Sequence, residues 1–186
     1  MKLISKFIFT KIMRWRISGN INFSSDSLKK AVIIAAPHTS WHDFYVGVLA
    51  RTAIGIKSKF IAKKEIFFFP FSIILKKIGG VSVDRSAKHN TVEQVAEMFA
   101  NEKEFRVALS PEGTRRKVSK FKTGFYYIAK KANVPIIMFT LNFKDKEILI
   151  SEPFYTTDNL ESDFNHIESF FDGVEGKIKE HSFYKN

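Results

Sequence analysis

Two absences limit what this chain can be. Its 186 residues contain no cysteine, which excludes disulfide bonds and thiolate chemistry and is consistent with a reducing compartment. No apolar run approaches the roughly 20 residues of a membrane-spanning helix, and the N-terminus lacks the uninterrupted apolar segment and cleavage site of a secretory signal. We therefore expect a single domain over residues 1–186, without a spanning segment or a cleaved leader.

Positive charge and phenylalanine are abundant instead. Thirty Lys and Arg against nineteen Asp and Glu give a formal net charge of +11, and 20 residues are Phe. Such a surplus indicates an anionic partner, which could be nucleic acid, an anionic bilayer or an acidic carrier protein. The sequence has no RNP-like, zinc-finger or helix-turn-helix signature, so we expect no nucleic-acid partner.

The most informative stretch is AVIIAAPHTSWHD, residues 31–43. Its six small or β-branched apolar residues predict a buried strand, which must end at Pro37 because proline cannot continue a central ladder. His38 then lies at the carboxyl end of the strand, and a helix is predicted to start near Ser40. Asp43 can reach back to the His38 imidazole, which predicts a general base oriented by a carboxylate, with the substrate's hydroxyl as nucleophile.

Two other interpretations of this stretch use the same residues. Ser40 to Asp43 form an acceptable capping box, so that Asp43 would only cap a helix. His38 and His42 are spaced like a pair of metal ligands, but no further cluster of ligands accompanies them, and we expect no metal.

Strands alternate with helices along the rest of the chain, which predicts a single α/β domain with a largely parallel or mixed sheet flanked by helices. The expected divisions are an N-terminal helix over 1–17, a core over 30–155 that carries the motifs, and a C-terminal helix over 158–180. Within the core we expect helices at 41–54, 90–101 and 124–133 and strands at 59–62, 81–83, 105–109, 135–142 and 147–151.

Two segments are typical of a membrane surface. Residues 1–17 form a basic amphipathic pattern with Trp and Phe, which predicts either an interfacial helix or a terminal helix docked on its own domain. Residues 66–75 are apolar on all sides and flanked by lysine pairs, so they are either buried or lie against lipid or an acyl chain.

Polar groups follow three of the predicted strands: His38 with Asp43, Asp84 with Arg85, and residues 112–116. Ligands in open α/β sheets bind at the carboxyl ends of strands, so all three should face one crevice. The guanidinium groups of Arg85 and Arg115 suit phosphate oxygens, and Gly113 allows close approach of the backbone to a ligand. The alternatives are a helix end at Gly79-Gly80, a type I turn at residues 110–113 and surface ion pairs for both arginines.

These residues form blocks in an order that closely resembles the glycerolipid acyltransferase family, which includes 1-acylglycerol-3-phosphate acyltransferases. The matching segments are His38-Thr-Ser-Trp-His-Asp43, Gly79-Gly-Val-Ser-Val-Asp-Arg85, Pro111-Glu-Gly-Thr-Arg115 and Val134-Pro-Ile136, together with a lysine turn at residues 62–65. The resemblance spans residues 30–155 and implies a glycerol-3-phosphate acyltransferase-like fold. It implies His38 and Asp43 as catalytic residues and Arg85, Glu112, Gly113, Thr114 and Arg115 as substrate-binding residues.

The resemblance implies an O-acyltransferase of phospholipid synthesis. A fatty acyl group would pass from an acyl-CoA or acyl carrier protein thioester to the hydroxyl of a lysolipid, here 1-acylglycerol-3-phosphate, to give phosphatidic acid. Lys63 or Lys64 is the predicted oxyanion donor, and no cofactor is expected besides the thioester co-substrate. We expect a peripheral enzyme on the cytoplasmic face of an anionic membrane. The alternatives are another lysolipid or lyso-aminolipid as acceptor, or a non-catalytic basic protein that binds membranes or nucleic acid.

Overall fold

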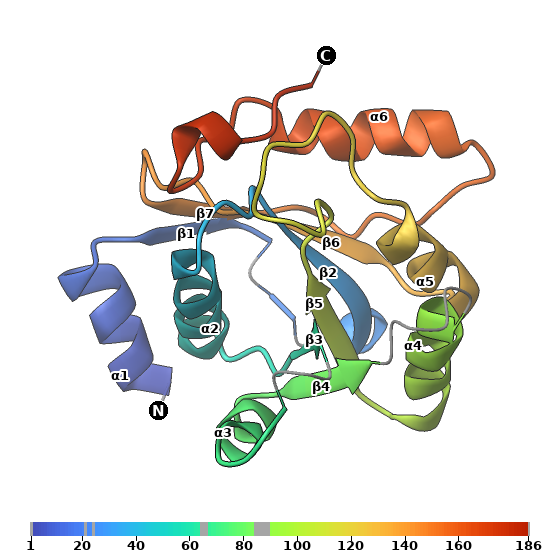
Figure 1. Ribbon diagram of the computed structural model, residues 1–186, viewed down its shortest axis with the longest axis horizontal. Helices are drawn as coiled ribbons and strands as arrows, with labels where there is room; N and C mark the ends of the chain where they lie inside the picture. The colour runs from blue at the N-terminus through green and yellow to red at the C-terminus, as the bar shows by residue number, and fades with distance from the viewer. Residues whose placement is uncertain (1, 21, 24, 64–66, 84–89, 186) are drawn as a thin grey trace.

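The computed structural model describes residues 2–20, 22–23, 25–63, 67–83 and 90–185, with the backbone alone at residues 62, 63, 71 and 90. One seven-stranded sheet runs through the molecule in the order β1-β7-β6-β2-β5-β3-β4 (Figure 1). Its strands are β1 (Arg16–Gly19), β2 (Lys30–Ala36), β3 (Lys59–Lys63), β4 (Gly80–Val83), β5 (Phe105–Leu109), β6 (Ile136–Thr140) and β7 (Glu147–Ile150). Each neighbouring pair is parallel except β6 and β7, so the expected α/β fold with a largely parallel sheet is confirmed.

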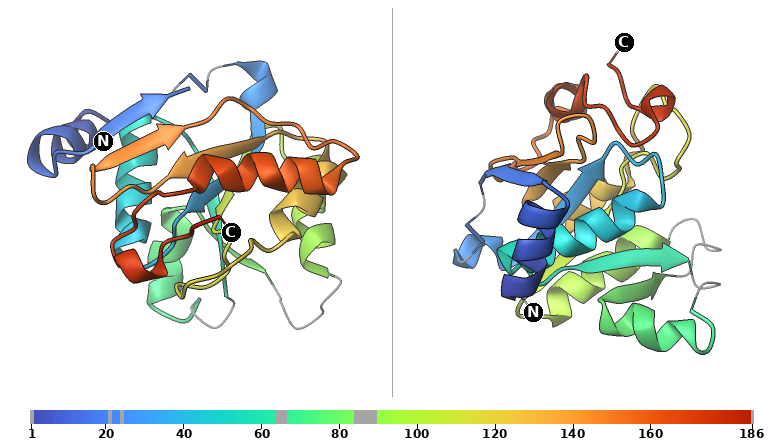
Figure 2. Two further views of the ribbon diagram at one scale, coloured as in Figure 1. Left: turned by 90° about the horizontal axis from the view of Figure 1, so that it is seen from above. Right: turned by 90° about the vertical axis from the view of Figure 1, so that its left-hand side faces the viewer.

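Helices cover both faces of this sheet (Figures 1 and 2). They are α1 (Lys2–Phe7), which continues into a π-helical turn, η1 (Ile8–Ile12), then α2 (His42–Ile54), α3 (Phe71–Lys77), α4 (Asn90–Asn101), α5 (Gly124–Ala132) and α6 (Leu160–Phe171). α1 and α2 lie on one face and α4, α5 and α6 on the other, while α3 packs beside the edge strand β4. None of the helices among these residues is long and apolar enough to cross a membrane.

β2 is the central strand and joins the two cores. Its side chains alternate between the faces, as a strand's geometry requires. Val32 and Ile34 pack with the α4, α5 and α6 side, whereas Ala31 and Ile33 pack with the α1 and α2 side. Because β5 and β6 flank β2 in parallel, the polar residues that follow β2 and β5 leave the sheet side by side.

The N-terminal helix is shorter than the 1–17 predicted from its apolar periodicity. Helical backbone ends at Ile12, Arg14 takes a left-handed conformation with φ 60°, and the chain continues as β1, which the sequence analysis missed. Phe9 and Trp15 are buried in the core, so this segment docks on its own domain. Leu3, Ile4, Phe7 and Ile12 are exposed instead.

The C-terminal helix also ends earlier than predicted. It stops at Phe171 instead of continuing to residue 180, and Gly173 follows with φ 73°. The apolar periodicity through Val174 and Ile178 continues beyond the helix by coincidence. The segment after Gly173 packs against the turn that follows β2 and includes one short 3-10 helix, η4 (Lys179–His181).

Candidate active site

The turn between β2 and α2 holds the central pair of the site. β2 ends at Ala36, Pro37 carries the chain out of the sheet, and α2 begins at His42, close to the predicted start. His38 is therefore fixed between a buried strand and the first turn of a helix, and its side chain remains 25% exposed.

Asp43 contacts the His38 ring through its Nδ1 atom. Its Oδ2 atom lies 2.9 Å from His38 Nδ1 and also accepts the backbone N–H groups of Thr39 at 2.7 Å and Ser40 at 2.8 Å. Since a carboxylate only accepts, Nδ1 carries the ring proton and Nε2 keeps its lone pair. Asp43 thus binds both the amides of the turn and the imidazole, so its contacts are compatible with the capping and the catalytic interpretations alike.

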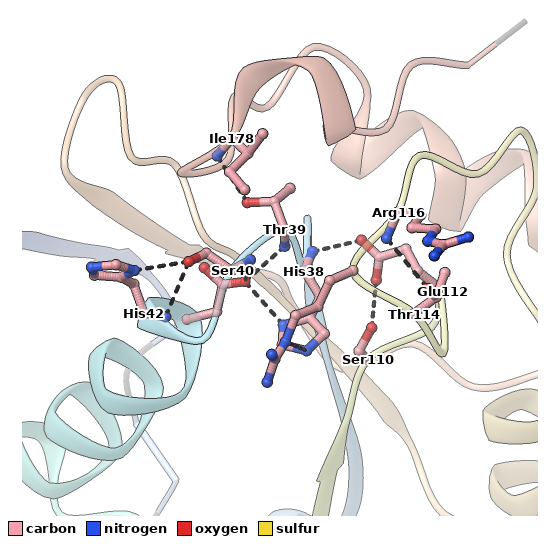
Figure 3. A network of polar contacts seen from close by, with 11 residues as sticks. His38, Thr39, Ser40, His42, Ser110, Glu112, Thr114, Arg116 and Ile178 are labelled. Atoms are coloured by element: carbon pink, nitrogen blue, oxygen red, sulfur yellow. Dashed lines mark hydrogen bonds and ion pairs between the residues drawn. The ribbon is translucent and has the colours of Figure 1, made fainter.

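His42 does not join this pair. Its Nδ1 atom lies 2.8 Å from the hydroxyl of Ser40, on the other side of the turn from His38 (Figure 3). Across the part of the chain that the structure describes, no three His, Cys, Asp or Glu side chains gather as a metal site would require.

Glu112 lies beneath the turn, and its substrate-binding role remains a prediction. Its side chain is only 3% exposed, and each carboxylate oxygen is already engaged. One accepts the His38 backbone N–H and the other the Ser110 hydroxyl, each at 2.7 Å (Figure 3). Burial raises the pKa of the Glu112 carboxyl, and these hydrogen bonds offset part of that rise. Glu112 therefore positions the backbone of His38.

The next three residues lie beside His38. Gly113, Thr114 and Arg115 line the cavity beside His38, and the Nε atom of Arg115 lies 3.4 Å from His38 Nε2. Gly113 has φ 63°, and a Cβ atom there would lie 2.8 Å from the ammonium of Lys122. The left-handed conformation favours glycine here, and Lys122, which the sequence analysis did not single out, lies beside it.

An apolar cavity of about 480 Å³ opens from this polar corner. It runs between α2 and strands β2, β3 and β5, and its apolar lining includes Ile33, Phe44, Val48, Phe60, Ile61, Leu109, Phe139 and Leu141. A polar corner at the end of an apolar hollow suits a ligand with a long hydrocarbon chain and a reactive polar end.

The C-terminal segment supports the His38 turn from outside, which the sequence analysis also missed. The backbone N–H of Ile178 donates to the Thr39 hydroxyl at 3.1 Å (Figure 3). A Cβ atom on Gly176 would lie 2.6 Å from Thr39, so glycine is needed where this segment crosses the turn. The glycines at 173 and 176 were the available signal that the helix could not continue.

Three predicted site residues are not placed. Lys64 and Arg85 lie outside the described residues, and Lys63 ends β3 with only its backbone described. Their assignments as oxyanion donors and as a phosphate ligand remain predictions.

Known proteins can now be compared with this site. The sequence profile of the Acyltransferase family matches residues 14–141, which is more than half of the chain and includes every residue of the site described so far except Ile178 and Gly176. The chain belongs to the acyltransferase family.

Individual relatives agree with this membership. A 1-acyl-sn-glycerol-3-phosphate acyltransferase of Haemophilus influenzae is 38% identical over 84 residues, covering 41% of this acyltransferase and 35% of the relative. The chloroplastic 1-acyl-sn-glycerol-3-phosphate acyltransferase BAT2 of Brassica napus is 28% identical over 138 residues, covering 63% of this acyltransferase and 40% of the relative. The matched segments therefore span well under half the length of these curated relatives.

The fold has a counterpart among solved structures. The 1-acyl-sn-glycerophosphate acyltransferase PlsC of Thermotoga maritima superposes with a TM-score of 0.65 at 20% identity, covering 91% of this acyltransferase and 74% of that chain. At this identity the likeness establishes the fold alone.

Proposed function

We propose that this acyltransferase transfers a fatty acyl group from a thioester to the hydroxyl of a lysolipid, with 1-acylglycerol-3-phosphate as the acceptor. The observation that carries the proposal is the His38 ring. Its Nδ1 is bound to Asp43, and its Nε2 accepts a 3.4 Å hydrogen bond from Arg115 Nε beside an apolar cavity of about 480 Å³, a bond that the hydroxyl of the acceptor would replace. The names of the relatives support the same acceptor.

The reaction uses the acceptor as its own nucleophile. His38 Nε2 takes the proton of the lysolipid hydroxyl as the oxygen bonds to the thioester carbonyl carbon. The tetrahedral intermediate then expels the sulfur, which takes the proton from the imidazolium to leave a free thiol and an ester. Asp43 stabilises the imidazolium between these steps. The thioester supplies the activated acyl group, so we propose that no metal or prosthetic group takes part.

Binding divides between the two parts of the site. The hydrocarbon chain of a substrate fits the apolar cavity, and the Arg115 guanidinium beside His38 suits the phosphate of the acceptor. Arg85 as a second phosphate ligand and Lys63 or Lys64 as oxyanion donors complete the proposal. Acyl-CoA and acyl carrier protein are both compatible as donors.

We propose a peripheral position on the cytoplasmic face of an anionic membrane. Leu3, Ile4 and Phe7 on α1 are 58–82% exposed, and α3 with the turn before it exposes Phe69 at 80% and Ile73 at 60%. Exposed apolar side chains on basic helices are typical of interfacial attachment. Truncating residues 1–16 would also remove the buried Phe9 and Trp15, so point substitutions on the exposed face are the better test.

Release of free thiol from an acyl thioester tests the activity directly. Purified protein should release thiol with lysophosphatidate present, and a panel of other lysolipids and a lyso-aminolipid should identify the preferred acceptor. The proposal would be contradicted if no acceptor in the panel supported thiol release. It would also be contradicted if thiol were released by hydrolysis at the same rate without an acceptor. For the membrane position, Leu3→Ser with Phe7→Ser should reduce sedimentation with anionic vesicles, and unchanged sedimentation would assign α1 to the fold alone.

A further inference from the structure

A second cavity of about 480 Å³ adjoins the far end of the apolar cavity that opens at His38, and the two share Arg51, Ile56 and Ser58 in their linings. The first residues of β3 and β5, Lys59 and Phe105, line it, so it sits at the amino ends of these strands. Its charged lining consists of Lys2, Arg51, Lys57, Lys59, Lys77 and Arg106 together with a single acidic side chain, Glu104.

Four of these six cations form no salt bridge with a described carboxylate, although Lys57 is close enough to Glu104 to help lower the pKa of that carboxyl. Arg106 is paired with Glu104 at 2.5 Å and Lys59 with Glu102 at 3.4 Å. The other four, Lys2, Arg51, Lys57 and Lys77, form no salt bridge with any described residue. The C-terminal ends of α2 and α3 also face this cavity, but each contributes only about half a negative charge. The cavity therefore keeps a positive charge that an anion would neutralise.

Arg51 forms a fixed wall of the cavity. Its guanidinium donates to the backbone carbonyls of Ser58 and Ile78, and burial lowers the pKa of this guanidinium. Gly79 makes the arrangement possible, since a Cβ atom there would lie 2.9 Å from the Ser58 carbonyl. A half-buried cation that is held only by neutral acceptors remains able to attract an anion.

The cavity lies between the two exposed apolar surfaces. Lys2 comes from α1 and Lys77 from α3, and both line it. Figures 1 and 2 show the N-terminal end of α1 and the helix α3 at the same end of the molecule. If the apolar side chains of α1 and α3 enter a bilayer, the mouth of the cavity between them lies at the level of the lipid headgroups.

We propose that this cavity binds the phosphate of an anionic phospholipid headgroup and so gives the protein a preference for anionic membranes. This inference rests on the proposed membrane position, and it is tested at Lys57 and Lys77, which line this cavity and not the one beside His38. The ligand is a phosphate monoanion or dianion that the bilayer presents, and the cations compensate its charge.

Vesicle sedimentation with the full chain tests the site. Wild-type protein should bind vesicles of phosphatidylcholine with phosphatidylglycerol more tightly than vesicles of phosphatidylcholine alone. Lys57→Ala with Lys77→Ala should weaken binding to the anionic vesicles by about twenty-five-fold, because each cation near the surface contributes about fivefold to the affinity. Lys57→Arg with Lys77→Arg should bind like the wild type.

A matched control has the same change in charge elsewhere. Lys130→Ala with Lys131→Ala removes two exposed lysines from α5, on the other face of the sheet, and should leave vesicle binding unchanged. Equal losses in the two double variants would reduce the effect to net charge and overturn the site. Saturable binding of inorganic phosphate without vesicles, abolished in the Lys57 and Lys77 variant, would assign the cavity to a soluble anion instead.

Failure of this inference is distinct from failure of the proposed activity. Thiol release with substrates in detergent micelles should be the same in the Lys57→Ala, Lys77→Ala variant and the wild type. Loss of micellar activity in this variant would place the cavity in the transfer reaction and contradict a role limited to the membrane. Absence of thiol release from the wild type would contradict the proposed function and leave the vesicle comparison standing.

Discussion

The two ends of the sheet use charge in opposite ways. At the carboxyl end, Asp43 and Glu112 are almost fully buried, and each accepts several hydrogen bonds from the backbone or side chains around His38. At the amino end, four cations that form no salt bridge with a described carboxylate surround a cavity. Buried carboxylates that accept hydrogen bonds from the turn hold one ring within a narrow geometry, whereas cations without a salt bridge attract any anion of suitable size.

In the account proposed here, the buried carboxylates beside His38 serve the transfer reaction, and the cations of the second cavity serve membrane binding. A general base needs one tautomer and one orientation, which the contacts of Asp43 supply. Attachment to a surface needs only the sum of several weak attractions. Substitutions at the carboxyl end should therefore change rates steeply, and those at the amino end should change affinity by small, additive steps.

The largest effect is expected for His38→Ala. Removing the base should lower kcat for thiol release by about 10²–10⁴-fold. His38 is partly exposed at a strand end, so the circular dichroism spectrum should match that of the wild type. A variant that keeps more than about a tenth of the wild-type kcat would contradict the base assignment.

Arg115→Lys keeps the positive charge beside His38 but removes the planar guanidinium group that can bind a phosphate with two parallel hydrogen bonds. Loss of one charged hydrogen bond should raise KM for lysophosphatidate by more than about tenfold. An uncharged monoacylglycerol should be affected less. The neighbouring Arg116→Lys, whose side chain does not line the cavity, is the matched control. Equal losses on both acceptors would show that Arg115 only shapes the loop.

Asp43→Asn should have a smaller effect than His38→Ala. The amide oxygen can still accept from His38 and from the two backbone N–H groups, so the ring keeps its orientation. What is lost is the charge that stabilises the imidazolium, and we expect kcat to fall by about tenfold. A kcat as low as that of His38→Ala would mean that Asp43 determines the geometry as well as the charge.

The smallest effect concerns the pH dependence of stability at Glu112. Its raised pKa means that the folded state holds this proton to higher pH than the unfolded state. Stability therefore falls as pH rises from the ordinary glutamate pKa through the raised one. Glu112→Gln can still accept from His38 and donate to Ser110, but it does not titrate. Chemical denaturation of both proteins across this range should show the wild type losing stability relative to the variant, and a constant difference would contradict the assignment.

Much of the carboxyl end could be predicted because its signals are local. The apolar run before Pro37 determined where β2 ends, and the spacing of His38 and Asp43 within one turn determined their contact. The role of Glu112 could not be predicted in this way. Its partner is the backbone of His38, 74 positions away, and no pattern in the sequence states which strand ends are neighbours.

The errors at the two termini have a different physical origin. Apolar periodicity predicted helices through residues 17 and 180, but tertiary packing ended both of them early. Arg14 takes a left-handed conformation that arginine seldom adopts, so its residue type gave no warning. Gly173 and Gly176 did give one, and the extended segment after them reaches the His38 turn only because the folded sheet brings the two together.

The most direct test applies the same two measurements to one variant at each end of the sheet. Thiol release in detergent micelles and sedimentation with anionic vesicles are measured for His38→Ala and for Lys57→Ala with Lys77→Ala. We predict that the first variant loses thiol release and keeps vesicle binding, and that the second loses vesicle binding and keeps thiol release. A variant at either end that loses both properties while remaining folded would contradict the separation of chemistry from membrane binding.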